Sequence, residues 1–198
     1  MSLAKLGYSK NWVKFKFITK EIVEDQTNEF KLSEDPTAEL LRFDSFMNWI
    51  ESRNSFTQDE IDQFLILALE DEDPLMAGAA VRELFSSPDL SDDLFNYMIT
   101  RLPEFGDWTK KLIHRETLVK RLQSEKITMA LYQECLNYKN EYDDNRLLIM
   151  LIPLCTKKEI LLDFKVNGCG KRIRTMAEKK LNKLLREETN QPIKGKKK

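Results

Sequence analysis

The chain has 198 residues, of which 41% are hydrophobic and 33% are charged, with a formal net charge of −1. Six glycines and six prolines are few for a protein rich in turns, which argues against an all-β sandwich or barrel and favours helices. The three cysteines are far apart, odd in number and outside any C-x-x-C pair, which is typical of a reducing compartment. No apolar segment approaches the roughly 18 residues of a membrane span, so we expect a cytoplasmic protein.

The charge is distributed very unevenly along the chain. Residues 21–107 contain 22 acidic against 5 basic side chains, a net charge of −17, whereas residues 156–198 contain 5 against 14, a net charge of +9. Residues 1–20 add five lysines and no acid. Such asymmetry informs about partners and not about the fold.

The N-terminal segment alternates charged and aromatic residues. Lys14 and Lys16 alternate with Phe15 and Phe17, a period of two that predicts a half-buried strand over 11–19. Residues 28–34 would pair with it as a β-hairpin. We therefore expect residues 1–35 to form an extended or β-hairpin cap, either packed on the helices that follow or serving as an edge strand for a partner.

The pattern becomes helical from Pro36 onward. Thr57 and Glu60 have the spacing of a capping box, as do Thr156 and Glu159. The pattern predicts about nine helices joined by short links, mostly in antiparallel pairs, within a helical domain at 36–187. Residues 188–198 show no apolar pattern and are interpreted as a mobile basic tail. The predicted helices include the ranges 57–68, 91–102, 109–122, 125–138, 144–152, 156–164 and 171–187.

Residues 73–84 resemble the second-helix motif of HEAT repeats. In that motif Asp-Pro precedes a helix with an aliphatic residue, an arginine, an alanine and a leucine at fixed spacing. Ala77 stands where arginine is usual, and the matching positions here are Asp73, Pro74, Met76, Ala80 and Leu84.

A second copy near the C-terminus matches the other half of the motif. Ile173, Arg174, Ala177 and Leu181 are in place, whereas Gly170 stands where aspartate is usual. Residues 144–155 fit loosely. The resemblance implies a mainly α fold, with antiparallel helix pairs stacked as a short HEAT-like α-solenoid. In that family the aspartate and arginine connect successive repeats, and no copy here has both.

The acidic run Glu70, Asp71, Glu72 and Asp73 directly precedes Pro74. It lacks the alternating ligands, the glycine and the distant glutamate of an EF-hand calcium loop. One interpretation is helix capping, with Asp73 as N-cap and Pro74 at the first helical position. The other is an acidic patch that contacts a protein partner. Gly78, farther along the same helix, suggests close helix-to-helix approach.

The segment 168–174, "GCGKRIR", superficially resembles a phosphate loop. A Walker A motif fails because Arg172 follows Lys171 where serine or threonine is required. A weaker hypothesis remains, in which a helix N-terminus beside the basic residues binds an anion and makes the nearby thiol reactive. The alternative is a solvated basic helix end. The residues of this hypothesis are Cys169, Lys171, Arg172 and Arg174.

The sequence offers no catalytic constellation. His114 is the single histidine, which excludes multi-histidine metal sites, and no serine or cysteine context supplies a nucleophile for it. We therefore expect no catalytic residue, no metal and no cofactor. We interpret His114 as a surface or packing residue.

These observations favour a non-enzymatic protein-binding scaffold or adaptor that recognises a basic partner through its acidic half. The alternative is nucleic-acid binding through the basic C-terminal region. A third hypothesis is an enzyme acting on modified DNA bases, since a HEAT-like fold also occurs in alkylpurine DNA glycosylases; the residues around Trp108 do not match their catalytic motif. The sequence leaves the oligomeric state open.

Overall fold

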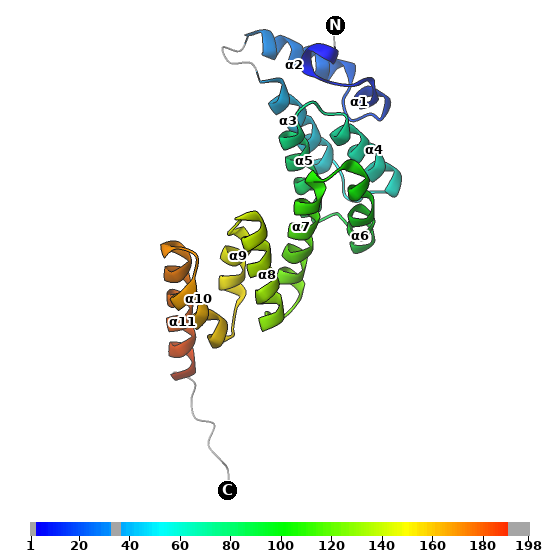
Figure 1. The fold of residues 1–198 in the computed structure, drawn as a ribbon. Coiled ribbons are helices and arrows are strands. Elements are labelled where there is room, and N and C mark those ends of the chain that lie inside the picture. Colours follow the sequence, from blue (N-terminus) through cyan, green and yellow to red (C-terminus); the bar gives the residue numbers. More distant parts are fainter. Residues whose placement is uncertain (1–2, 33–36, 190–198) are drawn as a thin grey trace. The chain divides into compact units, whose positions relative to one another are not determined.

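The computed structural model describes residues 3–32 and 37–189 (Figure 1). The described residues form eleven α-helices and two short 3-10 helices, with no strand among them. The protein is thus mainly α-helical, as predicted. The chain divides into two compact units, residues 1–113 and 114–198, each with its own hydrophobic core.

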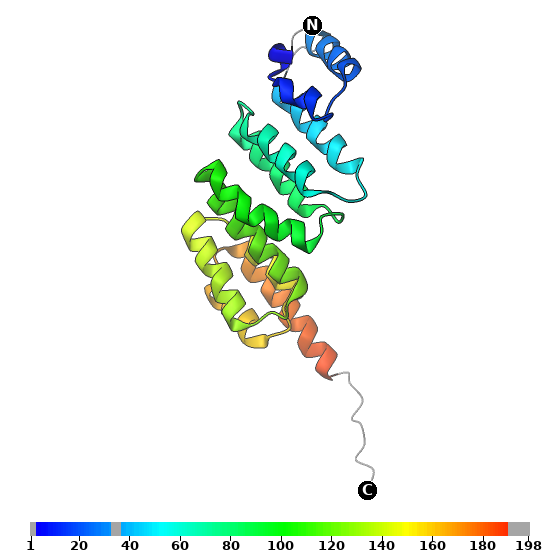
Figure 2. The same ribbon diagram turned by 90° about the vertical axis from the view of Figure 1, so that its right-hand side faces the viewer.

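The first unit contains all elements up to η2 and the beginning of α7. η1 lies beside α2 and α3 (Figure 2), α4 packs on α5 and α6, and α3 packs on α5. Its elements are η1 (Leu3–Leu6), α1 (Lys10–Lys14), α2 (Lys20–Leu32), α3 (Ala38–Glu51), α4 (Gln58–Leu69), α5 (Pro74–Ser86), α6 (Asp92–Arg101) and η2 (Leu102–Phe105). The helix α7 (Trp108–Ser124) crosses the boundary between the units.

Aromatic side chains fill the core of the first unit. Phe17 stacks on Trp49 with ring centroids 4.2 Å apart, and Trp12 and Phe64 each contact Phe46. All five side chains are buried. Because they come from α1, the following loop, α3 and α4, burial of these rings fixes the N-terminal segment onto the helices.

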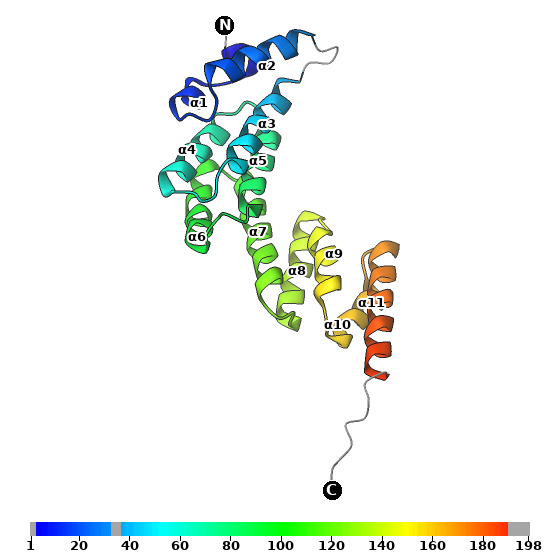
Figure 3. The same ribbon diagram turned by 180° about the vertical axis from the view of Figure 1, so that it is seen from behind.

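The second unit consists of most of α7 and four further helices. In Figure 3, α8 lies beside α9 and α10 lies beside α11. The predicted helix at 144–152 is confirmed as α9, in which Leu147, Leu148, Leu151 and Ile152 are buried. These helices are α8 (Met129–Tyr142), α9 (Arg146–Leu154), α10 (Lys158–Asn167) and α11 (Lys171–Thr189).

The predicted β-hairpin at the N-terminus is wrong. Residues 11–19 and 28–32 lie in or beside α1 and α2, and the remainder of the second expected strand, 33–34, lies outside the described residues. The alternating residues 14–17, which suggested a strand, form the C-terminal end of helix α1 instead. Lys16 adopts a left-handed φ of 61°, its N–H donates to the carbonyl of Val13, and the N–H of Phe17 donates to the carbonyl of Trp12. These two bonds and the Trp12–Phe17 ring contact make a Schellman motif.

Of the two predicted capping boxes, one is confirmed and one is wrong. Thr57 and Glu60 form the full capping box at the start of α4, which confirms that prediction. The second box is wrong, because α10 has Lys157 as its N-cap residue and no side-chain capping bond from Thr156. Helix α8 begins at Met129, later than predicted, because Thr128 caps it.

The predicted domain limits were residues 35 and 187, and the structure adds a division at 113/114 that the sequence did not suggest. Helix α11 reaches Thr189, so it includes the start of the predicted tail, and residues 190–198 lie outside the described residues. Across the described part of the chain, no helix combines the length and the apolar character needed to cross a lipid bilayer.

Candidate binding surfaces

The acidic cluster at 70–73 contains a buried ion pair. The guanidinium of Arg42 on α3 donates to both carboxylate oxygens of Asp71, at 2.7 and 3.0 Å, and the Asp71 side chain is 0% exposed. A third donor of Arg42 reaches the carbonyl of Leu6 at 2.8 Å. Burial alone would lower the pKa of Arg42, but the hydrogen bond and charge of Asp71 leave it raised. Asp71 therefore joins the link before α5 to α3 and does not face solvent, while Arg42 joins α3 to the N-terminal segment.

Two other carboxylates of the cluster also have intramolecular partners. Glu70 accepts hydrogen bonds from the Ser9 hydroxyl at 2.5 Å and from the Asn11 amide at 2.7 Å. Asp73 caps α5 by accepting from the backbone N–H groups of Leu75 and Met76. The capping interpretation is confirmed for Asp73.

Glu72 is the one exposed side chain of this cluster with no hydrogen bond among the described residues. Three of the four carboxylates thus support the N-terminal elements or start a helix, and Glu72 does neither. The hypothesis that the cluster also contacts a partner stays a prediction. It rests on Glu72 and on Glu70, which is exposed although both of its oxygens accept hydrogen bonds.

Helix α2 has an acidic outer face. Val23, Gln26 and Phe30 face the core, as their burial shows. The opposite face carries four exposed carboxylates within nine residues, and none of them forms an ion pair with a described residue. These carboxylates belong to Glu21, Glu24, Asp25 and Glu29. We call this set the α2 acidic face; the expected strand at 28–34 obscured its helical spacing.

In the basic turn at 168–174, one of the four side chains proposed to bind an anion is bonded to the backbone. Arg174 donates to the carbonyl of Gly168 at 3.0 Å and so closes the turn between α10 and α11. Lys171 and Arg172 are exposed without an ion pair among the described residues, and Cys169 is exposed. All four predicted residues are thus exposed, and Arg174 alone among them is also bonded to the backbone. Anion binding here stays a prediction.

Helix α11 has a basic outer face that extends well beyond this turn. Its exposed cations recur three to seven residues apart over four turns, and the later ones border a hollow of about 320 Å³. We call the cations Arg172, Lys179, Lys183 and Arg186 the α11 basic face. Lys183 lies 3.8 Å from Glu187, a contact too long and exposed to neutralise the face.

His114 packs against aromatic rings. Its ring contacts Tyr138 and Tyr142 edge-on at 5.2 and 5.9 Å, and Nδ1 lies 3.9 Å from Glu141. Burial raises the pKa of Tyr138 to about 12 and that of Cys135 to about 11, so neither is ionised at neutral pH. Within residues 3–32 and 37–189, no three histidine, cysteine or acidic side chains come together as a metal site would require.

Gly78 tests the expectation of close helix packing. A β-carbon at this position would lie 3.5 Å from the Trp108 ring, which is ordinary van der Waals contact. The helix α5 therefore passes Trp108 with room for a methyl group, and close approach does not require glycine here.

Comparison with known proteins yields no relative: no family model, curated protein or solved structure matches the chain at a significant level. The HEAT-like resemblance consequently stays a prediction drawn from the sequence motifs.

Proposed function

We propose that the protein is a non-enzymatic binding module of HEAT-like α-solenoid type, which recognises a basic protein partner through its acidic half. The observation that carries this proposal is the α2 acidic face. Its four carboxylates share one exposed side of a helix, and no described cation pairs with them. The cluster at 70–73 contributes mainly by holding the N-terminal elements in place.

The α2 acidic face has a cost to the folded protein. Glu21 and Asp25, and then Asp25 and Glu29, are four residues apart on one helix, where like charges repel and destabilise it. Glu21 is partly compensated because it lies in the first turn, near the positive end of the helix dipole. Asp25 and Glu29 have no such compensation, and a basic partner would relieve their repulsion.

The expected contribution of this face is to the rate of association more than to affinity. Exposed charges of one sign steer an oppositely charged partner toward the surface, and salt weakens the effect within a Debye length of about 10 Å at 0.1 M. Binding through the α2 acidic face should therefore weaken as salt is added.

The test uses a labelled arginine-rich peptide and three simultaneous changes, Glu24→Lys, Asp25→Lys and Glu29→Lys. We expect the wild-type protein to bind the peptide at about 50 mM NaCl and the variant to bind at least about tenfold more weakly in fluorescence anisotropy. The matched control reverses three exposed acids elsewhere in the same unit, Glu51, Asp59 and Asp93. Equal weakening in both variants would show that only net charge matters, and the proposed face would be wrong.

A second candidate function, nucleic-acid binding, is supported by the α11 basic face. Four cations along one side of a helix match the regular negative charge of a phosphate backbone. Reversal of Lys179 and Lys183 to glutamate should abolish binding of a labelled DNA oligonucleotide, whereas reversal of Lys14 and Lys31 in the first unit should not. Absence of DNA binding by the wild-type protein at about 50 mM salt would eliminate this candidate.

A further inference from the structure

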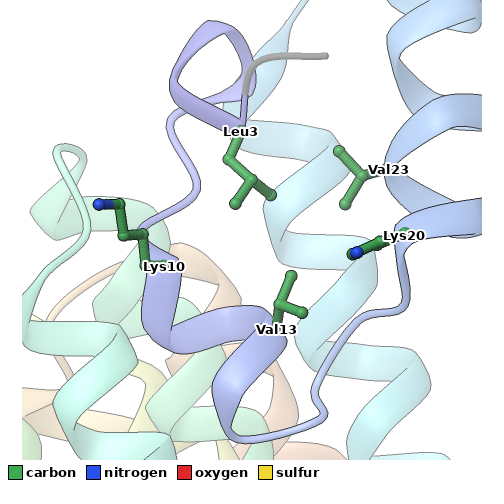
Figure 4. Close-up of a pocket in the computed structure, with 5 residues that line it drawn as sticks. All are labelled: Leu3, Lys10, Val13, Lys20 and Val23. Carbon is green, nitrogen blue, oxygen red and sulfur yellow. The ribbon is translucent and has the colours of Figure 1, made fainter.

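A pocket of about 460 Å³ opens among the three N-terminal elements η1, α1 and α2, all of them within the first unit. It is lined by Leu3, Lys10, Val13, Lys20 and Val23. In Figure 4 the branched ends of Leu3, Val13 and Val23 point toward a common space. Its volume lies within the range of about 300–1,000 Å³ that is typical of small-molecule sites.

Polar contacts outside the pocket hold each of its walls. Arg42 binds the carbonyl of Leu6 at the end of η1, and Glu70 binds Asn11 in α1. Gln26 of α2 accepts a hydrogen bond of 2.7 Å from Tyr8. All three elements are therefore fixed by contacts that a ligand would not disturb, and the pocket is preformed.

The two charged residues that line the pocket are both lysines, although the unit as a whole is acidic. The ammonium of Lys20 points into the common space in Figure 4, whereas that of Lys10 points away from it. Neither lysine forms an ion pair with a described residue. The nearest acid in sequence, Glu21, is hydrogen-bonded to Thr19, and residues 1–20 contain no acid. Lys20 thus offers a cation without an ion pair at the edge of an apolar space, with Glu21 as its nearest negative charge in sequence.

These features define the chemistry of a ligand. Three aliphatic side chains provide no aromatic ring for stacking, and polar groups placed among them would lose their hydrogen bonds to water without compensation. A single anionic group next to Lys20 would gain an ion pair in a partly desolvated setting. We propose that this pocket binds an aliphatic chain with one anionic head group, the chain against Leu3 and Val13 above the buried Val23, and the anion at Lys20.

Calorimetric titration of the full chain with decanoate and with decanol distinguishes the contribution of Lys20 from that of the apolar wall, because only decanoate carries a negative charge. We expect Lys20→Gln to weaken decanoate binding at least about fivefold and to leave decanol binding within about twofold. Val13→Gln should weaken both ligands because it makes the apolar wall polar. The matched control, Lys5→Gln, removes the same charge from an exposed lysine that does not line the pocket and should leave both affinities unchanged.

Two results would overturn the proposal. One is a wild-type protein, folded by circular dichroism, that binds decanoate no more tightly than about 1 mM. The other is equal weakening by Lys20→Gln and Lys5→Gln, which would assign binding to overall charge. Sedimentation with phosphatidylglycerol vesicles identifies the source of the ligand. If the protein pellets with the vesicles and decanoate prevents this, the ligand is a membrane lipid. If the protein binds decanoate but does not pellet, the ligand is a free fatty acid.

Discussion

At the scale of single residues, the contact between Arg42 and Asp71 organises the N-terminal third of the chain. The guanidinium can reach the Leu6 carbonyl because the next residue is Gly7. A β-carbon there would lie 2.4 Å from Nη1 of Arg42, and the φ of Gly7 is +73°. Glycine thus satisfies a steric and a conformational requirement at once. The ion pair and this glycine together hold the N-terminal segment against α3.

Asp71→Asn should destabilise the first unit by about 3 kcal/mol, because the change leaves the buried charge of Arg42 without its counter-ion. Urea denaturation followed by circular dichroism measures the free energy of unfolding. Glu72→Gln removes one charge from the neighbouring exposed position and should change stability by less than about 0.5 kcal/mol. Similar values for the two variants would mean that the buried pair contributes nothing beyond net charge.

At the scale of elements, a hydrogen bond from Tyr132 to Asp163 joins α8 to α10. This bond, followed by one from Asn167, lowers the pKa of Asp163. Burial, and then Asp163 itself, raises the pKa of Tyr132. The stabilisation is therefore present above the ordinary carboxyl pKa near 4 and lost as the pH falls below it. It is also lost as the pH rises above the ordinary tyrosine pKa near 10.

Tyr132→Phe should cost about 1 kcal/mol at pH 7, since the carboxylate is partly exposed, and the difference from wild type should shrink toward zero below about pH 4. Urea denaturation at pH 7, 5 and 3 measures it. Tyr138→Phe is the control, because the Tyr138 hydroxyl is buried without a hydrogen-bond partner among the described residues. A difference for Tyr132→Phe that does not vary over this range would show that packing, and not the hydrogen bond, is lost.

The sequence predicted elements wherever the local signal and the packing agree. Thr57 and Asp73 cap helices as predicted, because each cap bonds only to residues within its own first turn. Local spacing could not reveal the Schellman end at Lys16, whose bonds turn an alternating pattern into a helix terminus. Nor could it show that Asp71 pairs with Arg42, since that contact joins residues 29 positions apart.

At the scale of the whole molecule, the boundary between residues 113 and 114 separates two hydrophobic cores and also two segments of opposite net charge. Residues 1–113 contain 12 basic and 22 acidic side chains, a net charge of −10, and residues 114–198 contain 20 and 11, a net charge of +9. The near-neutral total therefore conceals two oppositely charged units. The proposed α2 and α11 surfaces each share the sign of their unit, so each would attract a different class of partner.

Because each unit has its own buried cluster, a defect in one core should lower stability mainly in that unit. Phe64→Leu and Phe164→Leu remove matched, fully buried rings from the first and second cores and should each cost about 1–2 kcal/mol. Native-state hydrogen exchange should show lost protection within residues 3–32 and 37–113 for Phe64→Leu and within 114–189 for Phe164→Leu. Helix α7 contributes Leu112 to the first core and Leu118 to the second, so its two halves should follow different variants. Equal loss of protection throughout the chain in both variants would instead mean that α7 couples the cores into one cooperative unit.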